Sequence, residues 1–287
     1  MSVLIADNGT LMQFVPNVLK CVQGELSLYE KIAPHLEVAE QWLTATFLSE
    51  RVLTVITSGA DDSYRLLHYA RMVVTAEAML HAVPQLDLVL TPNGFGIVNN
   101  ANVVPASKER LQRLLATLEK IRDDALQVLL PLLAAQGDWR ESKPCLFFEQ
   151  TLYPWLDLPR KLGFGEHTWL KFQELHEKQF AIEERLAHDF FSCELLNVLR
   201  KANLHNDWEN TASAPHYRSA WQHIFAIVLF MLREEEANPP FVSCIEVVNS
   251  LRNAPDAVFH EWKNSEVAKL FENHGYKNLK KSGGFWF

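Results

Sequence analysis

The sequence has few of the residues and segments that secreted or membrane proteins need. Only four of its 287 residues are cysteine, and they are far apart, without a C-x-x-C pair: Cys21, Cys145, Cys193 and Cys244. This distribution argues against a disulfide framework and predicts buried free thiols in a reducing cytoplasm, with a metal site as the alternative. No apolar run approaches the ~20 residues that cross a bilayer, and the N-terminal residues MSVLIADNGT lack the basic start of a signal peptide. We therefore expect a protein that is neither secreted nor inserted in a membrane.

The sequence also lacks an excess of basic charge. Its net charge is −8, no run of five like charges occurs, and the two halves on either side of the Lys143–Pro144 bond each carry −4. Domains that bind nucleic acid are usually basic, with lysine and arginine gathered on one face. We therefore expect no nucleic-acid partner. The composition, 48% hydrophobic and 22% charged, is that of an ordinary globular protein.

The motifs of common enzyme chemistry are missing as well. Gly94-Phe95-Gly96 and Gly163-Phe164-Gly165 are not followed by the lysine and hydroxyl residue of a phosphate-binding loop. No glutamate stands three residues before a histidine, no two histidines are four residues apart, and no G-x-S-x-G occurs. The usual di-metal, zincin and serine-hydrolase signatures are therefore absent. The sequence assigns no catalytic, metal-binding or cofactor-binding residue, and no cofactor.

Three groups of polar residues have a structural interpretation that we favour over a chemical one. Glu184 and His188 are one helical turn apart, which is typical of a solvated surface pair; a pair of metal ligands is the alternative. Cys193, close to His188, is interpreted as a structural thiol on a core-facing helix rather than as a nucleophile. Asp61-Asp62 suits the start of a helix, with magnesium binding as the alternative.

Most of the chain has apolar residues at the three- and four-residue spacing of helices. Ser27 followed by Glu30 forms a capping box, in which each side chain satisfies a backbone N–H group of the first turn. Pro34 predicts a kink or a delayed start in the first of the helices. Pro131 predicts the end of a helix, and Pro215 is expected in the first turn of another. Helices are predicted over the ranges 27–47, 49–56, 62–82, 107–130, 168–202, 215–233, 240–252, 255–263 and 265–273.

Two helical segments of the sequence resemble each other. AEQWLTATFLSERVLTVI (39–56) aligns without gaps to IEERLAHDFFSCELLNVL (182–199) at an offset of 143. The identical pairs are Glu40/Glu183, Leu43/Leu186, Phe47/Phe190, Ser49/Ser192, Leu53/Leu196 and Val55/Val198. We infer an internal repeat, with coincidence between two apolar helices as the alternative.

These patterns predict a mainly α fold with two related helical-bundle halves, a small β-hairpin and short extended segments. Residues 1–137 are expected to form an N-terminal arm, with a short strand over 3–6, and a first helical half. Residues 138–166, rich in tryptophan and proline, are expected to form an extended connector. Residues 167–287 are expected to form the second half, which ends in an aromatic tail.

A hairpin is predicted near residues 86–98, where LDLVLTPNGFGIV has β-forming residues on both sides of a Pro-Asn-Gly turn. It could fold onto its own domain, project toward another subunit, or hold a ligand. In the second case its apolar residues would make the contact, together with the aromatic C-terminus. The candidate interaction residues are Leu88, Leu90, Phe95, Ile97, Phe285, Trp286 and Phe287. Gly283-Gly284-Phe285 is a candidate counterpart of the hairpin turn in the second half.

The hairpin and the helix after it carry a family resemblance. Residues 88–119 resemble a segment of uncharacterised structural proteins of Bacteroidetes phages and prophages. In that family LTP-x-GFG-[IV]-V is followed by a short spacer, PAS-x-x-R and a helix. The matching residues are Leu90–Val98 and Pro105–Arg110, so the resemblance covers about a tenth of the chain.

The resemblance implies a non-enzymatic component of the virion neck or head–tail connector. Such a protein would be made in the bacterial cytoplasm and incorporated into the virion. It would contact itself, as a ring or other homo-oligomer, and the neighbouring neck, portal and tail proteins. The alternatives are a bacterial helical enzyme or small-molecule-binding protein, which would have a deep pocket, and a general protein-interaction scaffold.

Overall fold

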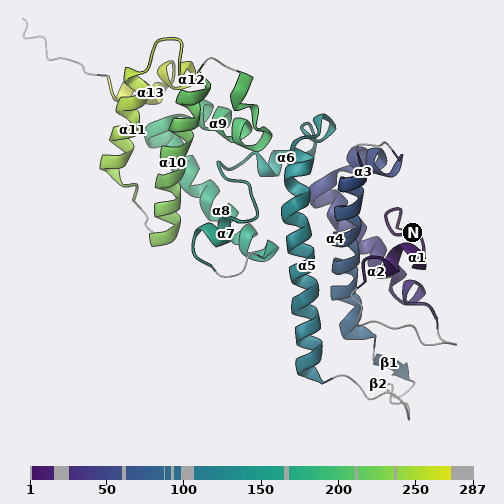
Figure 1. Cartoon of the computed structure of the whole chain (residues 1–287). Coiled ribbons are helices and arrows are strands. Elements are labelled where there is room, and N and C mark those ends of the chain that lie inside the picture. The colour runs from purple at the N-terminus through teal and green to yellow at the C-terminus, as the bar shows by residue number, and fades with distance from the viewer. Residues whose placement is uncertain are drawn as a thin grey trace, which may run out of the picture. The chain divides into compact units, whose positions relative to one another are not determined.

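The computed structural model describes residues 2–15, 26–59, 63–86, 88–91, 94–97, 107–164, 168–210, 213–235 and 238–272, and this part of the chain is mainly α-helical, as predicted (Figure 1). It forms two compact units. The first comprises Met1–Phe180 and Arg200–Asp207, and the second comprises Ala181–Leu199 and Trp208–Phe287. This division differs from the expected one after residues 137 and 166. The chain passes from one unit to the other inside helical segments. The sequence at these boundaries therefore does not have the composition of a linker.

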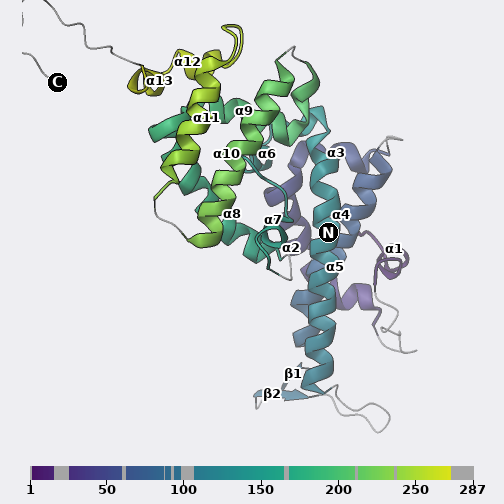
Figure 2. The same cartoon turned by 60° about the vertical axis from the view of Figure 1, so that its left-hand side comes forward.

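The first unit is a helical bundle that carries the two strands. Its elements are α1 (Asn8–Met12), α2 (Leu28–Leu43), the π-helical turn η1 (Thr44–Leu48), α3 (Glu50–Thr57), α4 (Tyr64–Ala82), the 3-10 turn η3 (Val83–Gln85), β1 (Leu88–Thr91), β2 (Gly94–Ile97), α5 (Lys108–Ala134), the 3-10 turn η4 (Gly137–Trp139), α6 (Lys143–Phe148) and α7 (Leu158–Lys161). Helix α4 packs against both α2 and α5 (Figure 2), and the apolar faces of these three helices form a large part of the core.

The second unit contains helices only, among its described residues. Helix α8 (Trp169–Leu186) begins in the first unit and ends in the second, and α9 (Cys193–His205) does the reverse. The remaining elements are the π-helical turn η5 (Ala187–Phe191), the 3-10 turn η6 (Asp207–Asn210), α10 (Ala214–Glu234), α11 (Phe241–Asn253), α12 (His260–Lys263) and α13 (Glu266–Leu270). None of the described helices has both the length and the apolar character that a bilayer crossing requires.

The helix starts follow the capping signals of the sequence. The Ser27 hydroxyl accepts a hydrogen bond from the Glu30 N–H group at 3.2 Å, and the Glu30 carboxylate accepts one from Ser27 N–H at 2.8 Å. Helix α2 therefore starts at the capping box, and the delayed start expected from Pro34 is wrong. Pro131 likewise lies inside α5, which continues to Ala134. Burial of the flanking leucines outweighs the backbone hydrogen bond that a proline removes.

The predicted repeat has a distinctive backbone in both units. Turns η1 and η5 are π-helical at the offset of 143, and each ends at a serine with positive φ. Ser49 has φ 78° and ψ 155°, and Ser192 has φ 64° and ψ 147°. The Ser49 hydroxyl accepts from Val52 N–H at 3.4 Å, and the Ser192 hydroxyl accepts from Leu195 N–H at 3.2 Å. Ser49 and Ser192 are thus equivalent: each ends one helix and caps the next.

A tryptophan completes each π-helical turn. The indole N–H group of Trp139 donates to the Phe47 carbonyl at 2.5 Å, and that of Trp262 donates to the Phe190 carbonyl at 2.8 Å. Both carbonyls belong to buried residues. A buried carbonyl without a donor is costly, so this indole hydrogen bond stabilises an interrupted helix.

The tryptophans belong to a second repeated block that the sequence reasoning missed. DWRESKPCLFFEQ (138–150) matches EWKNSEVAKLFEN (261–273) at an offset of 123. Phe148 lies 5.5 Å from Phe47 between ring centroids, and Phe271 lies 6.1 Å from Phe190. The elements therefore correspond one to one: α2 to α8, α3 to α9, α4 to α10, α5 to α11 and α6 to α13. The two halves are related helical units.

This order of elements corrects the expected counterpart of the hairpin. The hairpin lies between α4 and α5, and the corresponding helices α10 and α11 are joined by residues 235–240. Gly283-Gly284-Phe285 follows α13 in the chain, so it is not the equivalent segment. Those three residues lie outside the described part of the chain.

The segment 138–166 was expected to be extended, and this prediction is wrong for its described residues, 138–164. They contain η4, α6 and α7 within the first unit. Pro144 and Pro159 occupy the first turns of α6 and α7, where a missing N–H group does no harm. The apolar side chains that suggested a surface connector are core residues: Trp139, Cys145, Phe148 and Leu152 are fully buried.

The described N-terminal arm, residues 2–15, packs onto the first unit. The expected strand over 3–6 is absent there, and a short helix, α1, follows with Asp7 as its cap. Leu4, Ile5 and Leu11 are fully buried. The Glu40 carboxylate accepts hydrogen bonds from the Ser2 hydroxyl at 2.7 Å and from Leu4 N–H at 2.7 Å. Burial and these charge-assisted bonds fix the arm.

Candidate interaction surfaces and a polar cluster

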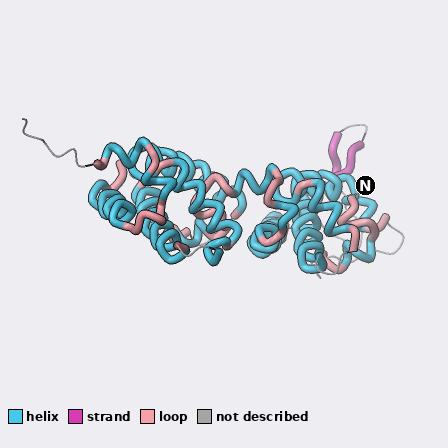
Figure 3. The backbone as a smooth tube through the Cα atoms, turned by 90° about the horizontal axis from the view of Figure 1, so that it is seen from above, coloured by secondary structure: helices cyan, strands magenta, loops and turns pink. Residues whose placement is uncertain are grey.

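The hairpin places four of the candidate interaction residues in register. Strands β1 and β2 pair antiparallel, with Leu88 opposite Ile97 and Leu90 opposite Phe95 (Figure 3). Residues directly opposite each other, and residues two apart in a strand, occupy the same face of a β-ribbon. These four positions therefore share one face, and Val89 and Gly96 share the other with Thr91 and Gly94. We call the first face the ribbon face.

The ribbon is not part of a larger sheet. Among the described elements, β1 and β2 contact each other extensively, and neither makes an extensive interface with a helix. A two-stranded ribbon alone is marginally stable in water. The other candidate interaction residues, Phe285, Trp286 and Phe287, lie outside the described part of the chain.

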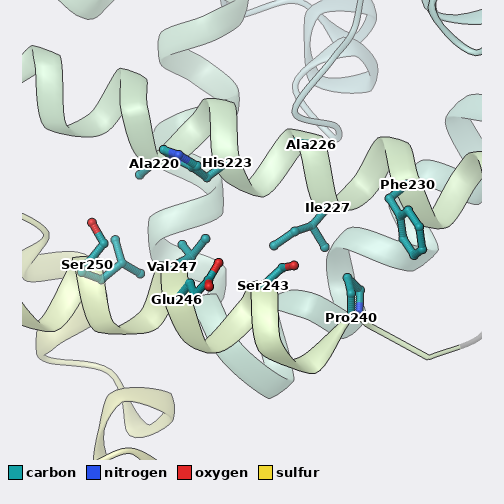
Figure 4. A pocket seen from close by; sticks show the side chains of 11 residues that line it. Ala220, His223, Ala226, Ile227, Phe230, Pro240, Ser243, Glu246, Val247 and Ser250 are labelled. Carbon is teal, nitrogen blue, oxygen red and sulfur yellow. The ribbon is translucent and has the colours of Figure 1, made fainter.

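A groove between α10 and α11 is a second candidate surface, which the sequence did not indicate. It has a volume of about 600 Å³. Its lining comes from both helices and from Pro240 at the start of α11 (Figure 4): Ala220, His223, Ala226, Ile227, Phe230, Pro240, Ser243, Glu246, Val247, Ser250 and Leu251. Ile227, Val247 and Leu251 form an apolar floor, and Phe230 is 46% exposed. The groove can bind an apolar group.

The groove reflects a difference between the two units. In the first unit α4 and α5 form the most extensive helix–helix interface, whereas their counterparts α10 and α11 contact each other much less. Ile224 and Phe225 on α10 are buried. The adjacent face of α10, with Ile227 and Phe230, is the one that lines the groove.

A polar cluster in the first unit brings together Cys145, Glu149 and His205. The Cys145 thiol lies 3.6 Å from Glu149 Oε1 and 3.8 Å from His205 Nε2, and the latter two atoms are 3.0 Å apart. On its other side, His205 Nδ1 lies 3.2 Å from the Ala134 carbonyl oxygen. Cys145 is fully buried, and the side chains of Glu149 and His205 are 12% and 5% exposed.

The electrostatics of the polar cluster argue against a nucleophilic cysteine. Burial raises the pKa of the Cys145 thiol to about 12, and the Glu149 carboxylate adds to this shift. Burial alone would raise the pKa of Glu149, but the His205 hydrogen bond and Lys201 outweigh it and lower that pKa. Both Cys145 and Glu149 face the same histidine nitrogen, whereas a catalytic triad holds its acid on the opposite nitrogen.

The sequence reasoning missed this cluster. Cys145 and Glu149 are one helical turn apart, which was an available signal, but His205 is 56 residues beyond Glu149. Among the described residues this is the single group of three potential metal ligands, so Glu184 and His188 do not belong to one.

The expectation of buried thiols holds for Cys145 and Cys244 and is wrong for Cys193, which is exposed. Cys193 is the first residue of α9, where the helix has just emerged from the π-helical turn and its side chain faces solvent. Cys21 and the Asp61-Asp62 pair lie outside the described residues.

Comparison with known proteins gives one match. No curated protein matches the chain, and no solved structure matches it. Residues 17–148 are similar to a family of unknown function (DUF6712). The matched range begins before α2 and ends with α6, so it covers the first copy of the repeat and none of the second.

Proposed function

We propose that the protein is a non-enzymatic structural protein of a phage or prophage, a component of the virion neck or head–tail connector that works by self-association. The observation that carries this proposal is the register of the hairpin, which gathers Leu88, Leu90, Phe95 and Ile97 on the ribbon face. The family resemblance supports the virion setting, because its motif includes the same hairpin and the start of α5.

The ribbon is suited to contact another protein chain. Its strands are only four residues long, and among the described strands each pairs on one side only, so its outer edge can add to a strand of a neighbouring molecule. Burying a large apolar side chain contributes about 1.5–3 kcal/mol relative to leaving it exposed. Burial of these four side chains against a neighbouring copy is the proposed driving force for the ring contact. The neighbouring neck, portal and tail proteins are the other proposed partners.

The test compares the two faces of one strand pair by size-exclusion chromatography with light scattering over a range of concentrations. Wild-type protein is expected to form a ring or other homo-oligomer. Phe95→Asp, on the ribbon face, should weaken self-association at least tenfold without lowering the melting temperature, since about 1.4 kcal/mol already corresponds to tenfold. Val89→Asp, on the opposite face, is the matched control and should leave association nearly unchanged.

Two outcomes would contradict the proposal. One is a wild-type protein that stays monomeric at every salt and protein concentration. The other is a Phe95→Asp variant that unfolds, since the hairpin would then belong to the core of its own unit.

A further inference from the structure

We propose that Cys145, Glu149 and His205 bind one zinc ion, with three protein ligands and one position left for water. The site lies in the first unit, away from the hairpin in the sequence, and does not depend on the proposed structural role. A thiolate, an imidazole and a carboxylate are the ligand types that zinc takes in proteins, whereas magnesium and calcium prefer oxygen alone.

The distances in the cluster fit a tetrahedral ion. With typical zinc–ligand bond lengths, the sulfur–nitrogen and sulfur–oxygen edges of the tetrahedron are about 3.5 Å and the nitrogen–oxygen edge about 3.3 Å. The corresponding distances here are 3.8, 3.6 and 3.0 Å. Each distance differs from the ideal edge by about 0.3 Å or less. Small rotations of the side chains can remove this difference.

The histidine is oriented as a metal ligand. Its Nδ1 atom faces the Ala134 carbonyl at 3.2 Å, so Nδ1–H can donate there and Nε2 is left to bind the ion. Ligand histidines are commonly held by such a second hydrogen bond. Lys201, which is 65% exposed, lies 3.9 Å from the other oxygen of Glu149, so the carboxylate side of the cluster is near solvent and gives the ion a path of entry.

Short helix α6 and its C-cap residue, Glu149, provide the other two ligands. Its cap, Ser142, accepts from Cys145 N–H at 3.2 Å, and Glu149 N–H donates to the Cys145 carbonyl at 2.9 Å. The thiol and the carboxylate thus lie one turn apart on a fixed backbone. Binding would replace the thiol proton, which leaves to solvent, by the metal ion.

The repeat shows that the fold does not require this thiol. The counterpart of Cys145 in the second unit is Ala268, which is also buried, while the counterpart of Glu149 is again a glutamate, Glu272. A small side chain satisfies the packing at this position in α13. The sulfur atom of the first unit is therefore available for a role other than packing.

The test measures metal directly on the full-length protein. Purified wild type, loaded with zinc and dialysed, should hold about one zinc per chain by elemental analysis. Loading with cobalt should give the charge-transfer absorption of a cobalt–thiolate bond. Cys145→Ala, which has a precedent in Ala268, should abolish that absorption and weaken zinc binding at least tenfold, and Glu149→Gln and His205→Gln should weaken it comparably. Cys244→Ala, a buried thiol in the second unit, is the matched control and should change neither measurement.

A second measurement separates metal binding from folding. A chelator should lower the melting temperature of the zinc-loaded wild type and leave that of Cys145→Ala unchanged. The proposal is overturned if wild type retains no stoichiometric zinc and shows no cobalt–thiolate band, or if Cys244→Ala loses metal as readily as Cys145→Ala. In that case the cluster is a hydrogen-bonded group of the core.

Discussion

At the residue scale, the two serines that end the π-helical turns are strained. A positive φ combined with ψ near 150° is a region occupied almost only by glycine, and other residues there cost about 1–3 kcal/mol. Ser49 and Ser192 both adopt it. Their hydroxyl groups recover part of this cost as helix caps, which a glycine could not provide.

We expect Ser49→Gly to stabilise the first unit by about 1 kcal/mol, because the relief of backbone strain exceeds the loss of the cap. Ser49→Ala should destabilise it by about 1 kcal/mol, since the strain stays and the cap is lost. Denaturant unfolding of both variants measures the difference. Ser192→Gly should stabilise the second unit less, because the Ser192 hydroxyl also donates a hydrogen bond to the Glu261 carbonyl at 3.3 Å, which glycine loses. Equal effects of glycine and alanine at position 49 would show that the strain is negligible.

His176 gives the first unit a pH dependence. It is almost fully buried, stacks on Phe147 and lies 3.2 Å from the Phe147 carbonyl oxygen. Burial lowers its pKa from 6.5 to about 4. Between these two values the unfolded chain binds a proton that the folded chain does not. Stability is therefore complete above pH 6.5 and falls as the pH drops toward 4, by up to ~3 kcal/mol.

The variant His176→Gln keeps a donor for the carbonyl and does not titrate, so it should remove most of this fall in stability. Unfolding curves at several pH values between 4 and 7 give the slope. The exposed His223, changed to Gln, is the control and should preserve the wild-type slope. An unchanged slope in His176→Gln would assign the pH dependence to other groups.

At the element scale, each bundle depends on one indole hydrogen bond to an interrupted helix. Trp139→Phe keeps most of the apolar surface but leaves the Phe47 carbonyl without its donor. We expect a loss of about 3 kcal/mol, combining an unsatisfied buried carbonyl with imperfect packing. Trp262→Phe should cost a similar amount through Phe190.

Calorimetric melting curves would measure both losses. Trp42→Phe is the control, because Trp42 is only partly buried, and it should cost no more than about 1 kcal/mol. If Trp42→Phe and Trp139→Phe lowered the melting temperature equally, the indole hydrogen bond would contribute nothing specific.

The elements also show what the sequence could and could not predict. Apolar spacing and capping residues located most helices to within a few residues, because these signals are local. Prolines were misleading in α5 and in α6, since a proline is tolerated where packing or a first turn compensates for it. Only one repeated block was found, because the first copy has 20 more residues between Phe47 and Trp139 than the second has between Phe190 and Trp262.

Of the candidate sites, one could be predicted from local sequence patterns and one could not. The ribbon residues follow from alternation along two adjacent strands, which is visible in the sequence. The polar cluster depends on the packing of the end of α9 against α6, which links residues about 60 apart. No local pattern records such a contact.

At the scale of the whole molecule, the two units share an order of helices and differ in two features. The first keeps α4 and α5 closely packed and carries the hairpin, and the family match covers this copy alone. In the second, the described residues between the corresponding helices contain no strand, and the apolar groove lies between these helices. The groove also keeps open the alternative of a small-molecule-binding protein, since its volume lies within the range of ligand pockets.

We expect an apolar fluorescent dye to bind the folded protein saturably in this groove. Ala226→Trp, at an exposed position of the lining, should fill the groove and weaken dye binding severalfold without lowering the melting temperature. Fluorescence titration measures the affinity. Leu270→Trp, on the exposed face of α13, is the control and should bind dye as wild type does. Equal binding by both variants would place the dye elsewhere.

The indole hydrogen bond also determines when each bundle can be completed during synthesis. Phe47 leaves the ribosome 92 residues before Trp139, which at ordinary translation speed is an interval on the order of ten seconds. Throughout that time the π-helical turn lacks its donor, although the helices around it have already been made. In both units the tryptophan that donates this hydrogen bond is therefore made well after the π-helical turn that accepts it. A nascent chain interrupted before Trp139 contains α2, α4 and α5 but has no indole donor for the Phe47 carbonyl.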